Sequence, residues 1–562
     1  MKKILSLIIA VVMISSVIVP AGSAFAAARN TEIPIIYIRG NGQAICNADG
    51  EEVICDIGDL SLEDDEDEGK NKIVEATVNI LLPFLTEGLI FDNWDGYEKA
   101  IYDEISPLFK EAILDGNGDP QYGTHLDPEL QEINERSKIK YGNYSFYTYG
   151  FYFDWRLSPY DNLEKLEAYL DNVLEATGAE QIALTSRCLG GSLLNVYLEK
   201  HADDKSPKNP EKNLIKNVMY CDTLSSGCTL ISKGFSGQLE FDSKSIQMYE
   251  AQLGYLDEIG YGTGMNIPGI AGEIVEKTLD LFTQTGVVDK LTDSVEKLYS
   301  RLYKALIPAL FKAIGYASQP IYWTFVEEED FDLALKVMFG EEGSEERIAN
   351  EGLIDKILKY RENITSKHDE LLKSFADEIH IGVVAKYGLM AAPITTGYGE
   401  LSDTLASVKD SSMGATCSTI GKTLTDDYIQ GRINKGYADY ISPDKQVDTS
   451  TCLFPETTWI IKNAHHDDFD RCFKDLAETF LSGTNVTVKS SGYSRFRVVD
   501  YKNNAVTDMT EENCADLEFL TVAEENPTTE TKLASLIRFL TVIIDFFTRL
   551  FKGELDFSKL FG

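Results

Sequence analysis

Short apolar stretches of strand length alternate with longer amphipathic stretches in the first half of the chain. Residues 33–38, 181–185 and 215–220 are mostly apolar and are followed by turn-forming residues, as is typical of strands buried on both faces. Apolar residues within 163–174 instead recur at helical spacing, and Gly178 follows as a helix stop. This alternation predicts an α/β fold with a mostly parallel sheet and helices on both faces.

A mostly helical pattern then interrupts the strands from about Leu230 to Ala376. Helical spacing is found in residues 274–282, 291–314, 331–339 and 354–375. Strand-like stretches resume at 381–387 and 458–461, and a helical pattern covers 470–481. An insertion of this size between strands of one sheet is expected to form a large helical cap over a site.

The last apolar stretch, residues 533–551, is interrupted by Arg538, Asp545 and Arg549. These charges argue against a membrane-spanning helix. The preferred interpretation is an amphipathic helix that packs on the core. The alternative is an interfacial helix that touches lipid.

The first 26 residues have the three parts of a secretory signal peptide. Two lysines precede an apolar run over 4–19, and Ala24-Phe25-Ala26 supplies a small-residue cleavage site. The mature chain is therefore expected to begin near Ala27 and to be secreted, either free outside the cell or associated with its surface.

Composition narrows the class of protein further. The chain has 562 residues, 43% of them hydrophobic, and a formal net charge of −39. A negative charge of this size argues against a nucleic-acid partner and against simple electrostatic docking on anionic lipid. It is typical of a soluble secreted protein, with one large decorated domain or several smaller ones.

The run Ser186-Arg187-Cys188-Leu189-Gly190-Gly191 carries the strongest chemical signal. It joins a predicted strand to a helical stretch over 192–200, with Ser186 and Gly190 as small residues two positions on either side of Cys188. A nucleophile on a tight strand-to-helix turn needs small neighbours, and the following helix directs its positive end at the turn. The run predicts a thiol nucleophile for acyl transfer. The alternative is a buried structural cysteine in a glycine-rich turn.

The chain has nine cysteines, an odd number, so internal disulfides leave at least one thiol unpaired. With Cys188 set aside, eight remain, enough for four bridges. Proximity in sequence gives two hypotheses, Cys46 with Cys55 and Cys221 with Cys228.

Five segments in order resemble the lecithin:cholesterol acyltransferase-like α/β-hydrolases, a lipase and acyltransferase family. They are residues 34–42, Asp154-Trp155-Arg156-Leu157-Ser158, the run around Cys188, residues 223–227, and Tyr387-Gly388 with Pro393 and Ser402-Asp403-Thr404-Leu405. The chain departs from the family by Cys188 in place of serine, Leu224 in place of proline, and Arg39 where many relatives carry proline or histidine.

The resemblance implies an α/β-hydrolase fold. Together with the residue patterns above, it divides the chain into a signal peptide over 1–26, hydrolase core over 27–229, helical cap over 230–376, hydrolase core over 377–520 and an amphipathic tail over 521–562. It also implies action on lipid or other acyl esters, with no metal or organic cofactor.

The resemblance further implies a triad in the chain order nucleophile, acid, histidine, with the histidine just after the last strand. Only His465 and His466 fit that position, and His466 is preferred because His466-Asp467-Asp468-Phe469 resembles the pattern of related lipases. His465 is then expected on the surface. Asp403 is the first choice of acid, with Asp444 and Asp448 as alternatives.

In this mechanism Cys188 attacks an ester or thioester carbonyl, and the backbone amides of Leu189 and Asn41 form the oxyanion hole. Two other functions remain open. The stretch Cys188-Leu189-Gly190-Gly191-Ser192 also resembles the cysteine box of polyhydroxyalkanoate synthases, although the signal peptide argues against their intracellular substrates. The chain is alternatively a binding or surface protein on a hydrolase scaffold that has lost catalysis.

Overall fold

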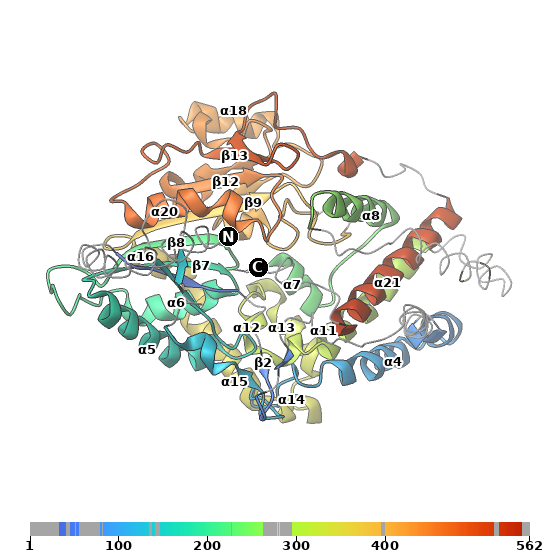
Figure 1. Ribbon diagram of the computed structural model, residues 1–562. Coiled ribbons are helices and arrows are strands. Elements are labelled where there is room, and N and C mark those ends of the chain that lie inside the picture. Colours follow the sequence, from blue (N-terminus) through green and yellow to red (C-terminus); the bar gives the residue numbers. More distant parts are fainter. Residues whose placement is uncertain are drawn as a thin grey trace, which may run out of the picture.

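The computed structural model describes residues 33–40, 45–50, 52–54, 79–80, 82–133, 138–140, 147–225, 227–261, 278, 280, 295–394, 399–521 and 528–552 (Figure 1). The predicted signal peptide, Asn41 and Cys55 lie outside these residues.

A nine-stranded sheet runs through the centre of the molecule in the order β14-β13-β12-β9-β8-β7-β1-β6-β5. Seven neighbouring strands from β13 to β6 are parallel, and the two edge strands β14 and β5 are antiparallel. The strands are β1 (Ile35–Ile38), β5 (Lys138–Lys140), β6 (Tyr147–Phe151), β7 (Ile182–Cys188), β8 (Ile215–Thr223), β9 (His380–Tyr387), β12 (Thr458–Lys462), β13 (Phe496–Asp500) and β14 (Ala505–Asp508). The predicted α/β class is confirmed.

Two small antiparallel sheets accompany the main one. They are formed by β2 (Ile45–Cys46), β3 (Glu52–Ile54) and β4 (His125–Leu126), and by β10 (Thr416–Cys417) and β11 (Val447–Asp448).

The α-helices of the described residues fall before, between and after the strands. They are α4 (Trp94–Ile105), α5 (Pro159–Thr177), α6 (Gly190–His201), α7 (Thr229–Phe235), α8 (Ser243–Glu258), α11 (Val295–Ala313), α12 (Pro320–Trp323), α13 (Phe331–Phe339), α14 (Glu345–Ala349), α15 (Glu351–Asn363), α16 (His368–Phe375), α17 (Val408–Ser411), α18 (Asp426–Asn434), α19 (Phe469–Cys472), α20 (Lys474–Ser482) and α21 (Thr529–Lys552).

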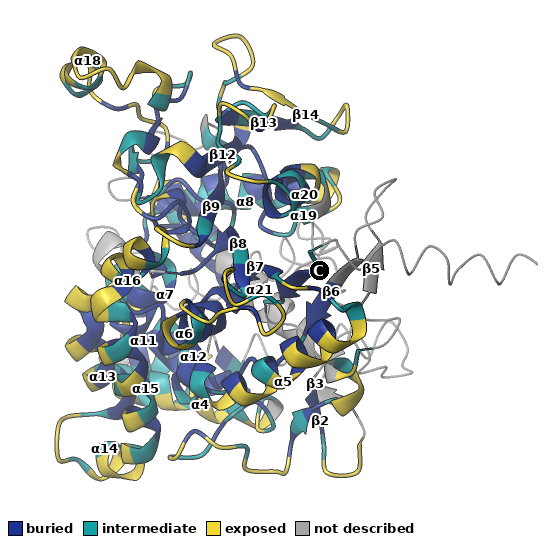
Figure 2. Cartoon of the chain, turned by 90° about the vertical axis from the view of Figure 1, so that its left-hand side faces the viewer, coloured by how far each residue is buried: buried dark blue, intermediate teal, exposed yellow. Residues whose placement is uncertain are grey.

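The two faces of the sheet are covered by different helices (Figure 2). Ile36 and Leu184 belong to a core shared with α5 and α6, whereas Ile35 and Ala183 belong to a core shared with α20. Because successive side chains of a strand point to opposite faces, the continuous apolar strands of the sequence can supply both cores at once.

A separate core lies among helices at one side of the sheet. Most of its buried residues come from α4, α8, α11 and the first half of α21, including Leu306 of α11 and Leu533, Leu536 and Leu540 of α21. The first half of the last helix therefore packs on protein, as in the preferred interpretation of the sequence. Within the described part of the chain, no helix combines the length and the apolarity that crossing a bilayer requires.

The predicted helices and strands correspond closely to the observed ones, with one informative difference at β7. The sequence predicts that this strand stops at Thr185, but it continues to Cys188, which pairs with Thr223 of β8 after an irregularity in the register. The polar residues Ser186 and Arg187 are buried in the sheet and conceal this extension. The predicted helix at 274–282 falls largely outside the described residues.

The predicted disulfide between Cys221 and Cys228 is wrong, because both residues carry free thiols. Cys221 is on strand β8, where its sulfur lies 3.6 Å from the hydroxyl of Thr185, and Cys228 directs its sulfur toward the carbonyl oxygen of Leu405 at 3.8 Å. The sheet therefore separates two cysteines that are close in sequence. The other hypothesis involves Cys55, which lies outside the described residues.

Candidate active site

Cys188 ends strand β7 in a left-handed backbone conformation. Its φ is +50°, in the region that favours glycine, and the residue is 4% exposed. Two glycines leave room for this turn. A Cβ added at Gly40 would lie 3.0 Å from Cβ of Cys188, and one added at Gly190 would lie 2.5 Å from the carbonyl oxygen of Ile38. The end of β1 and the loop after it therefore pack closely against Cys188 and the start of α6.

Helix α6 begins directly after this turn, with buried Leu189 as the residue before its first turn. The positive end of the helix dipole therefore lies beside Cys188, where it favours negative charge on the sulfur or on a bound oxygen. Leu189 is one of the two predicted oxyanion donors. The other, Asn41, lies outside the described residues, and Gly40 before it contacts Cys188.

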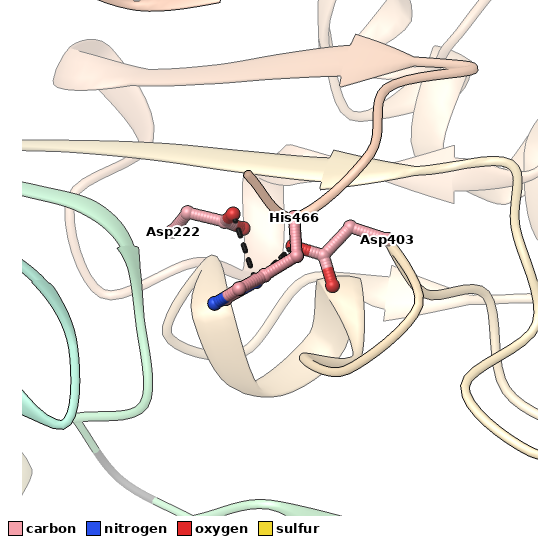
Figure 3. Close-up of side chains that lie close together, drawn as sticks. All are labelled: Asp222, Asp403 and His466. Atoms are coloured by element: carbon pink, nitrogen blue, oxygen red, sulfur yellow. Dashed lines mark hydrogen bonds and ion pairs between the residues drawn. The ribbon is translucent and has the colours of Figure 1, made fainter. Parts of the chain in front are cut away.

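His466 follows strand β12 and contacts Asp403, which lies in the loop after β9 (Figure 3). Nδ1 of the imidazole is 2.7 Å from Oδ2 of Asp403, and the backbone amide of His466 donates to the Asp403 carbonyl oxygen at 2.8 Å. The other carboxylate oxygen accepts hydrogen bonds from the amides of Leu405 and Ala406, at 3.0 and 2.8 Å. The structure thus brings together the predicted base and the predicted acid, and fixes the acid from three directions.

Cys188 and His466 lie at the same edge of the sheet, where the parallel strands end. Arg187, the residue before Cys188, donates to the carbonyl oxygen of His466 at 2.6 Å. Nε2 of His466 is buried and has no hydrogen-bond partner among the described residues. A hydrogen bond between Nε2 and the Cys188 sulfur is therefore not formed in this structure, as is common before a substrate is bound.

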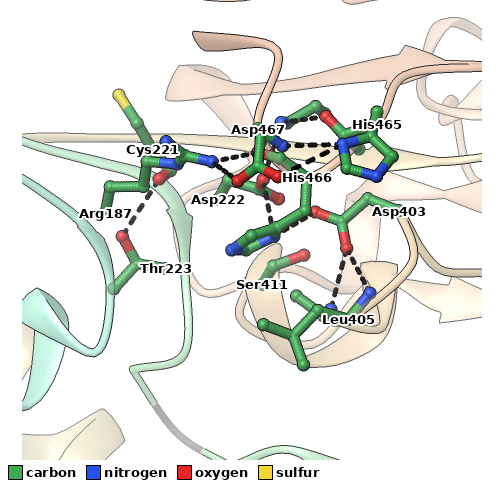
Figure 4. Close-up of polar contacts among 12 residues, drawn as sticks. Arg187, Cys221, Asp222, Thr223, Asp403, Leu405, Ser411, His465, His466 and Asp467 are labelled. Carbon is green, nitrogen blue, oxygen red and sulfur yellow. Dashed lines mark hydrogen bonds and ion pairs between the residues drawn. The ribbon is translucent and has the colours of Figure 1, made fainter. Parts of the chain in front are cut away.

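A buried network of charges surrounds the imidazole and was not predicted (Figure 4). The guanidinium of Arg187 contacts Asp467 at 2.6 Å, and the ammonium of Lys386 contacts Asp222 at 2.8 Å. Oδ2 of Asp222 lies 3.1 Å from Nδ1 of His466. The signal was present in the sequence, since Arg187, Asp222 and Lys386 each lie in or next to an apolar strand, where charged residues are rarely buried without a partner.

Burial and neighbouring charges shift the pKa values of this cluster. Burial alone would lower the pKa of His466, but Asp403 and Asp222 outweigh it and hold that pKa well above its usual value. Burial and the charge of Asp222 raise the pKa of Asp403 to about 6. For Asp222 burial acts in the same direction, yet Lys386 and His466 hold its pKa well below the usual range. The imidazole is therefore strongly basic in this environment.

The expectation that His465 lies on the surface is wrong, since it is 4% exposed. Its ring stacks on Tyr261 with centroids 4.4 Å apart, and its backbone amide donates to the hydroxyl of Tyr501 at 2.9 Å. Its Nδ1 accepts from the amide of Asp467 at 3.1 Å. His465 therefore packs behind the loop that presents His466.

The two alternative acids lie in other contacts. Asp444 accepts from the hydroxyl of Tyr387 at 2.6 Å and pairs with Lys462 at 2.7 Å. Asp448 pairs with Arg432 at 2.9 Å. Neither alternative contacts His466 among the described hydrogen bonds and ion pairs.

Two groups of described residues have ligand-type atoms close enough together to hold a metal ion. One is Asp222, Asp403 and His466, and the other is Glu327, Glu329 and Asp330. In the first group the ammonium of Lys386 already compensates Asp222, and both oxygens of Asp403 are engaged. In the second, Lys233 contacts Glu329 and Asp330 at 3.1 and 2.9 Å. We interpret both groups as ion-paired clusters.

A cavity of about 310 Å³ lies beside the loop that carries Asp403. Its apolar lining includes Leu230, Leu239 and Leu405, and its charged lining includes Lys233 and Glu400. Neither Cys188 nor His466 is among its described lining residues, so we do not assign it to the reacting group of a substrate.

No protein-family model and no curated protein matches this chain. Among solved structures, a chain of the crystal structure of the Tle4-Tli4 complex aligns with 64% of this chain and 76% of its own length. The sequence identity is 13% and the TM-score is 0.24. A likeness of this degree carries no argument about fold or function.

Proposed function

We propose that this protein is an acyl hydrolase or acyltransferase of the α/β-hydrolase type, with Cys188 as nucleophile, His466 as base and Asp403 as acid. The observation that carries the proposal is the backbone of Cys188, a non-glycine residue held at φ +50° between strand β7 and helix α6. Backbone strain of this kind clusters at active sites, so it supports a functional hypothesis. The contact of His466 with Asp403 at 2.7 Å supports their roles.

In the proposed reaction the Cys188 sulfur, as thiolate, attacks the carbonyl carbon of an ester. The tetrahedral intermediate collapses, the carbon–oxygen bond breaks, and His466 gives its Nε2 proton to the departing alcohol. Water or a second alcohol, deprotonated by His466, then attacks the thioester and regenerates Cys188. Asp403 holds the imidazole through Nδ1, which leaves Nε2 for the proton.

In this proposal the helices between β8 and β9 form a cap. Helix α12 lies over α6, with the hydroxyls of Ser192 and Thr324 2.7 Å apart. Tyr316, from the same region, is close enough to Cys188 to interact with it electrostatically. The substrates are acyl esters, lipid esters among them, and the signal peptide directs the protein to the exterior of the cell.

Trapping of the acyl-enzyme tests the proposal. Wild-type protein is incubated with a panel of activated acyl esters and phospholipids, quenched in acid, and mapped by peptide mass spectrometry. We expect the acyl group on Cys188, released by neutral hydroxylamine as a thioester is. The Cys188→Ser variant should give an ester that resists this reagent, and Cys188→Ala should give none.

Cys221→Ala is the matched control, because Cys221 is a buried cysteine on the adjacent strand β8. It should leave acylation unchanged. Acylation that persists in Cys188→Ala, or a wild-type protein that is never acylated, would contradict the proposal. The second outcome would favour a binding protein on a hydrolase scaffold.

A further inference from the structure

A second carboxylate faces the imidazole of His466. Asp222 lies near the end of strand β8, and its Oδ2 is 3.1 Å from Nδ1 of His466, the same atom that contacts Asp403 at 2.7 Å (Figure 3). Both carboxylates are fully buried. Asp222 also has a φ of +55°, so a strained backbone holds this carboxylate in place, as it does the thiol of Cys188.

The negative charge of Asp222 depends on two partners. Its carboxylate makes ionic contacts with Lys386 and His466, and neither oxygen has a hydrogen-bond partner of good geometry among the described residues. Lys386 is itself occupied, since its ammonium also donates to the carbonyl oxygens of His465 and His466 at 2.6 Å each. Lys386 and the imidazole of His466 therefore both contact the same carboxylate oxygen of Asp222, and the imidazole is its second possible source of positive charge.

His466 is surrounded by charged side chains from several elements, and together they favour its protonated form. Strand β8 and the loop after β9 bring Asp222 and Asp403, while strand β9 brings Lys386. Arg187 of β7 and Asp467 compensate each other. With Cys188 left out, these charges sum to one negative charge when the imidazole is neutral and to zero when it is protonated. Uncompensated charge is costly in a buried site.

The remaining neighbour, His465, adds no charge, because burial and Lys386 hold its pKa well below the usual value. The raised pKa of His466 agrees with the sum of charges, although burial alone would act in the opposite direction. The imidazolium is therefore the form that the surrounding protein stabilises.

We propose that Asp222 is a positioning residue which, together with Asp403, keeps His466 protonated in the resting protein, so that Cys188 is used as a thiolate. This inference rests on the proposed function and deepens it. The proton that leaves the Cys188 sulfur goes to Nε2 of His466, and no co-reactant is needed. Cysteine suits such a site, because an ordinary thiol ionises at about pH 8.5 and serine does not ionise in the accessible range.

The thiolate absorbance at 240 nm tests this inference without any substrate. The spectrum of Cys188→Ser is subtracted from that of the wild type across pH 4 to 10, so that the difference reports Cys188 alone. We expect thiolate absorbance already at neutral pH, where an ordinary thiol is mostly protonated. In Asp222→Asn, with the same serine subtraction, the midpoint should rise by about 1–2 pH units because one of the two facing charges is lost.

The matched control is Asp444→Asn. Asp444 is also a buried carboxylate paired with a buried lysine, Lys462, at 2.7 Å, but it does not contact His466. A structural effect of losing a buried Asp–Lys pair should appear in both variants, whereas the shift of the midpoint should appear only in Asp222→Asn. An ordinary midpoint in the wild type, or equal shifts in the two variants, would overturn the inference.

A second measurement covers the case in which Asp222→Asn does not fold. Carbon-13 NMR of labelled histidine in the wild type, assigned with His466→Gln, should show His466 as an imidazolium at neutral pH, and a neutral ring would overturn the inference. Failure of the proposed function is seen separately. Acylation of Cys188 with an ordinary midpoint refutes only the resting ion pair, and a low midpoint without acylation refutes only the proposed acyl chemistry.

Discussion

Two buried lysine–aspartate pairs lie on adjacent strands of the sheet, and only one of them belongs to the candidate active site. Lys386 of β9 pairs with Asp222 at 2.8 Å, and Lys462 of β12 pairs with Asp444 at 2.7 Å. Both lysines are fully buried. In the ladder between the strands Lys386 lies opposite Ile461 and Lys462 lies opposite Tyr387, so the two lysines are one residue out of register and point to opposite faces.

The difference between the pairs lies in what completes them. Asp444 is closed off by the hydroxyls of Tyr387 and Ser442, at 2.6 and 2.5 Å, and Lys462 by Asp516 at 2.7 Å. Asp222 instead contacts the titratable ring of His466, whose Nε2 has no described partner. A buried ion pair is therefore poor evidence of function by itself. A buried polar atom beside the pair that has no hydrogen-bond partner among the described residues is the more informative feature.

The largest expected effect is the loss of activity when His466 is replaced, and the neighbouring His465 is its matched control. His466→Gln should lower kcat about 10³–10⁴-fold, because Nε2 of His466 carries the proton in the proposed reaction. His465→Gln should change kcat by less than about threefold, because His465 packs on Tyr261 and presents no proton to the site. Steady-state ester hydrolysis measures both. Equal losses in the two variants would contradict the assignment.

Replacing either lysine should destabilise the protein to a similar extent, but only one of the two replacements should lower its activity. Lys386→Met and Lys462→Met should each lower the free energy of unfolding by about 3–5 kcal/mol, since each removes the lysine partner of a buried carboxylate. Only Lys386→Met should also lower kcat, because Lys386 holds the carbonyl oxygens of His465 and His466 at 2.6 Å. Urea denaturation and kinetics measure the two effects.

Double variants supply the control for this prediction. Lys386→Met combined with Asp222→Asn, and Lys462→Met combined with Asp444→Asn, each remove both charges and should recover part of the lost stability. Absence of recovery in either double variant would show that packing, and not charge, sets the stability of that pair.

The comparison also shows how far the sequence could predict this molecule. Strand and helix patterns located most of the elements, because apolar periodicity reports burial directly. Local motifs and chain order single out Cys188, Asp403 and His466 as candidates, and the structure brings Asp403 and His466 into contact. Asp222 and Lys386 were missed as a pair: their charges in apolar strands were a signal of burial, but only the pairing of strands β8 and β9 shows that they meet.

The next largest expected effect is the loss of activity when the proposed acid, Asp403, is replaced, compared with replacement of Asp444. Asp403→Asn should lower kcat about 10²–10³-fold, with part of the orientation of His466 retained by Asp222 at 3.1 Å. In the wild type, Asp403 has a pKa raised to about 6, so it gains a proton and loses its charge as the pH falls below that value. The acid limb of kcat/KM should therefore lie near pH 6 as an apparent value of the coupled group.

Asp444→Asn is the matched variant for that experiment and should leave both kcat and the acid limb unchanged. An acid limb that moves in Asp444→Asn, or that persists unchanged in Asp403→Asn, would show that another group titrates.

The smallest expected effect concerns a third carboxylate, one that is only partly buried and has an arginine in place of a lysine as its partner. Glu250 of helix α8 has Arg538 of α21 at 3.9 Å, and its Oε1 has no described partner. Burial raises its pKa to about 7. Because the folded state binds this proton more tightly than the unfolded state, stability should fall as the pH rises from about 4.5 to about 7.

Glu250→Gln removes the cost of ionising this partly buried carboxyl group, so the stability of the variant relative to the wild type should increase by about 1 kcal/mol between pH 5.5 and pH 8. Urea denaturation at the two pH values measures this, with ester hydrolysis unchanged as the control. A relative stability independent of pH would mean that Arg538 compensates Glu250 as well as a lysine does, and the contrast among the three carboxylates would then rest on the histidine alone.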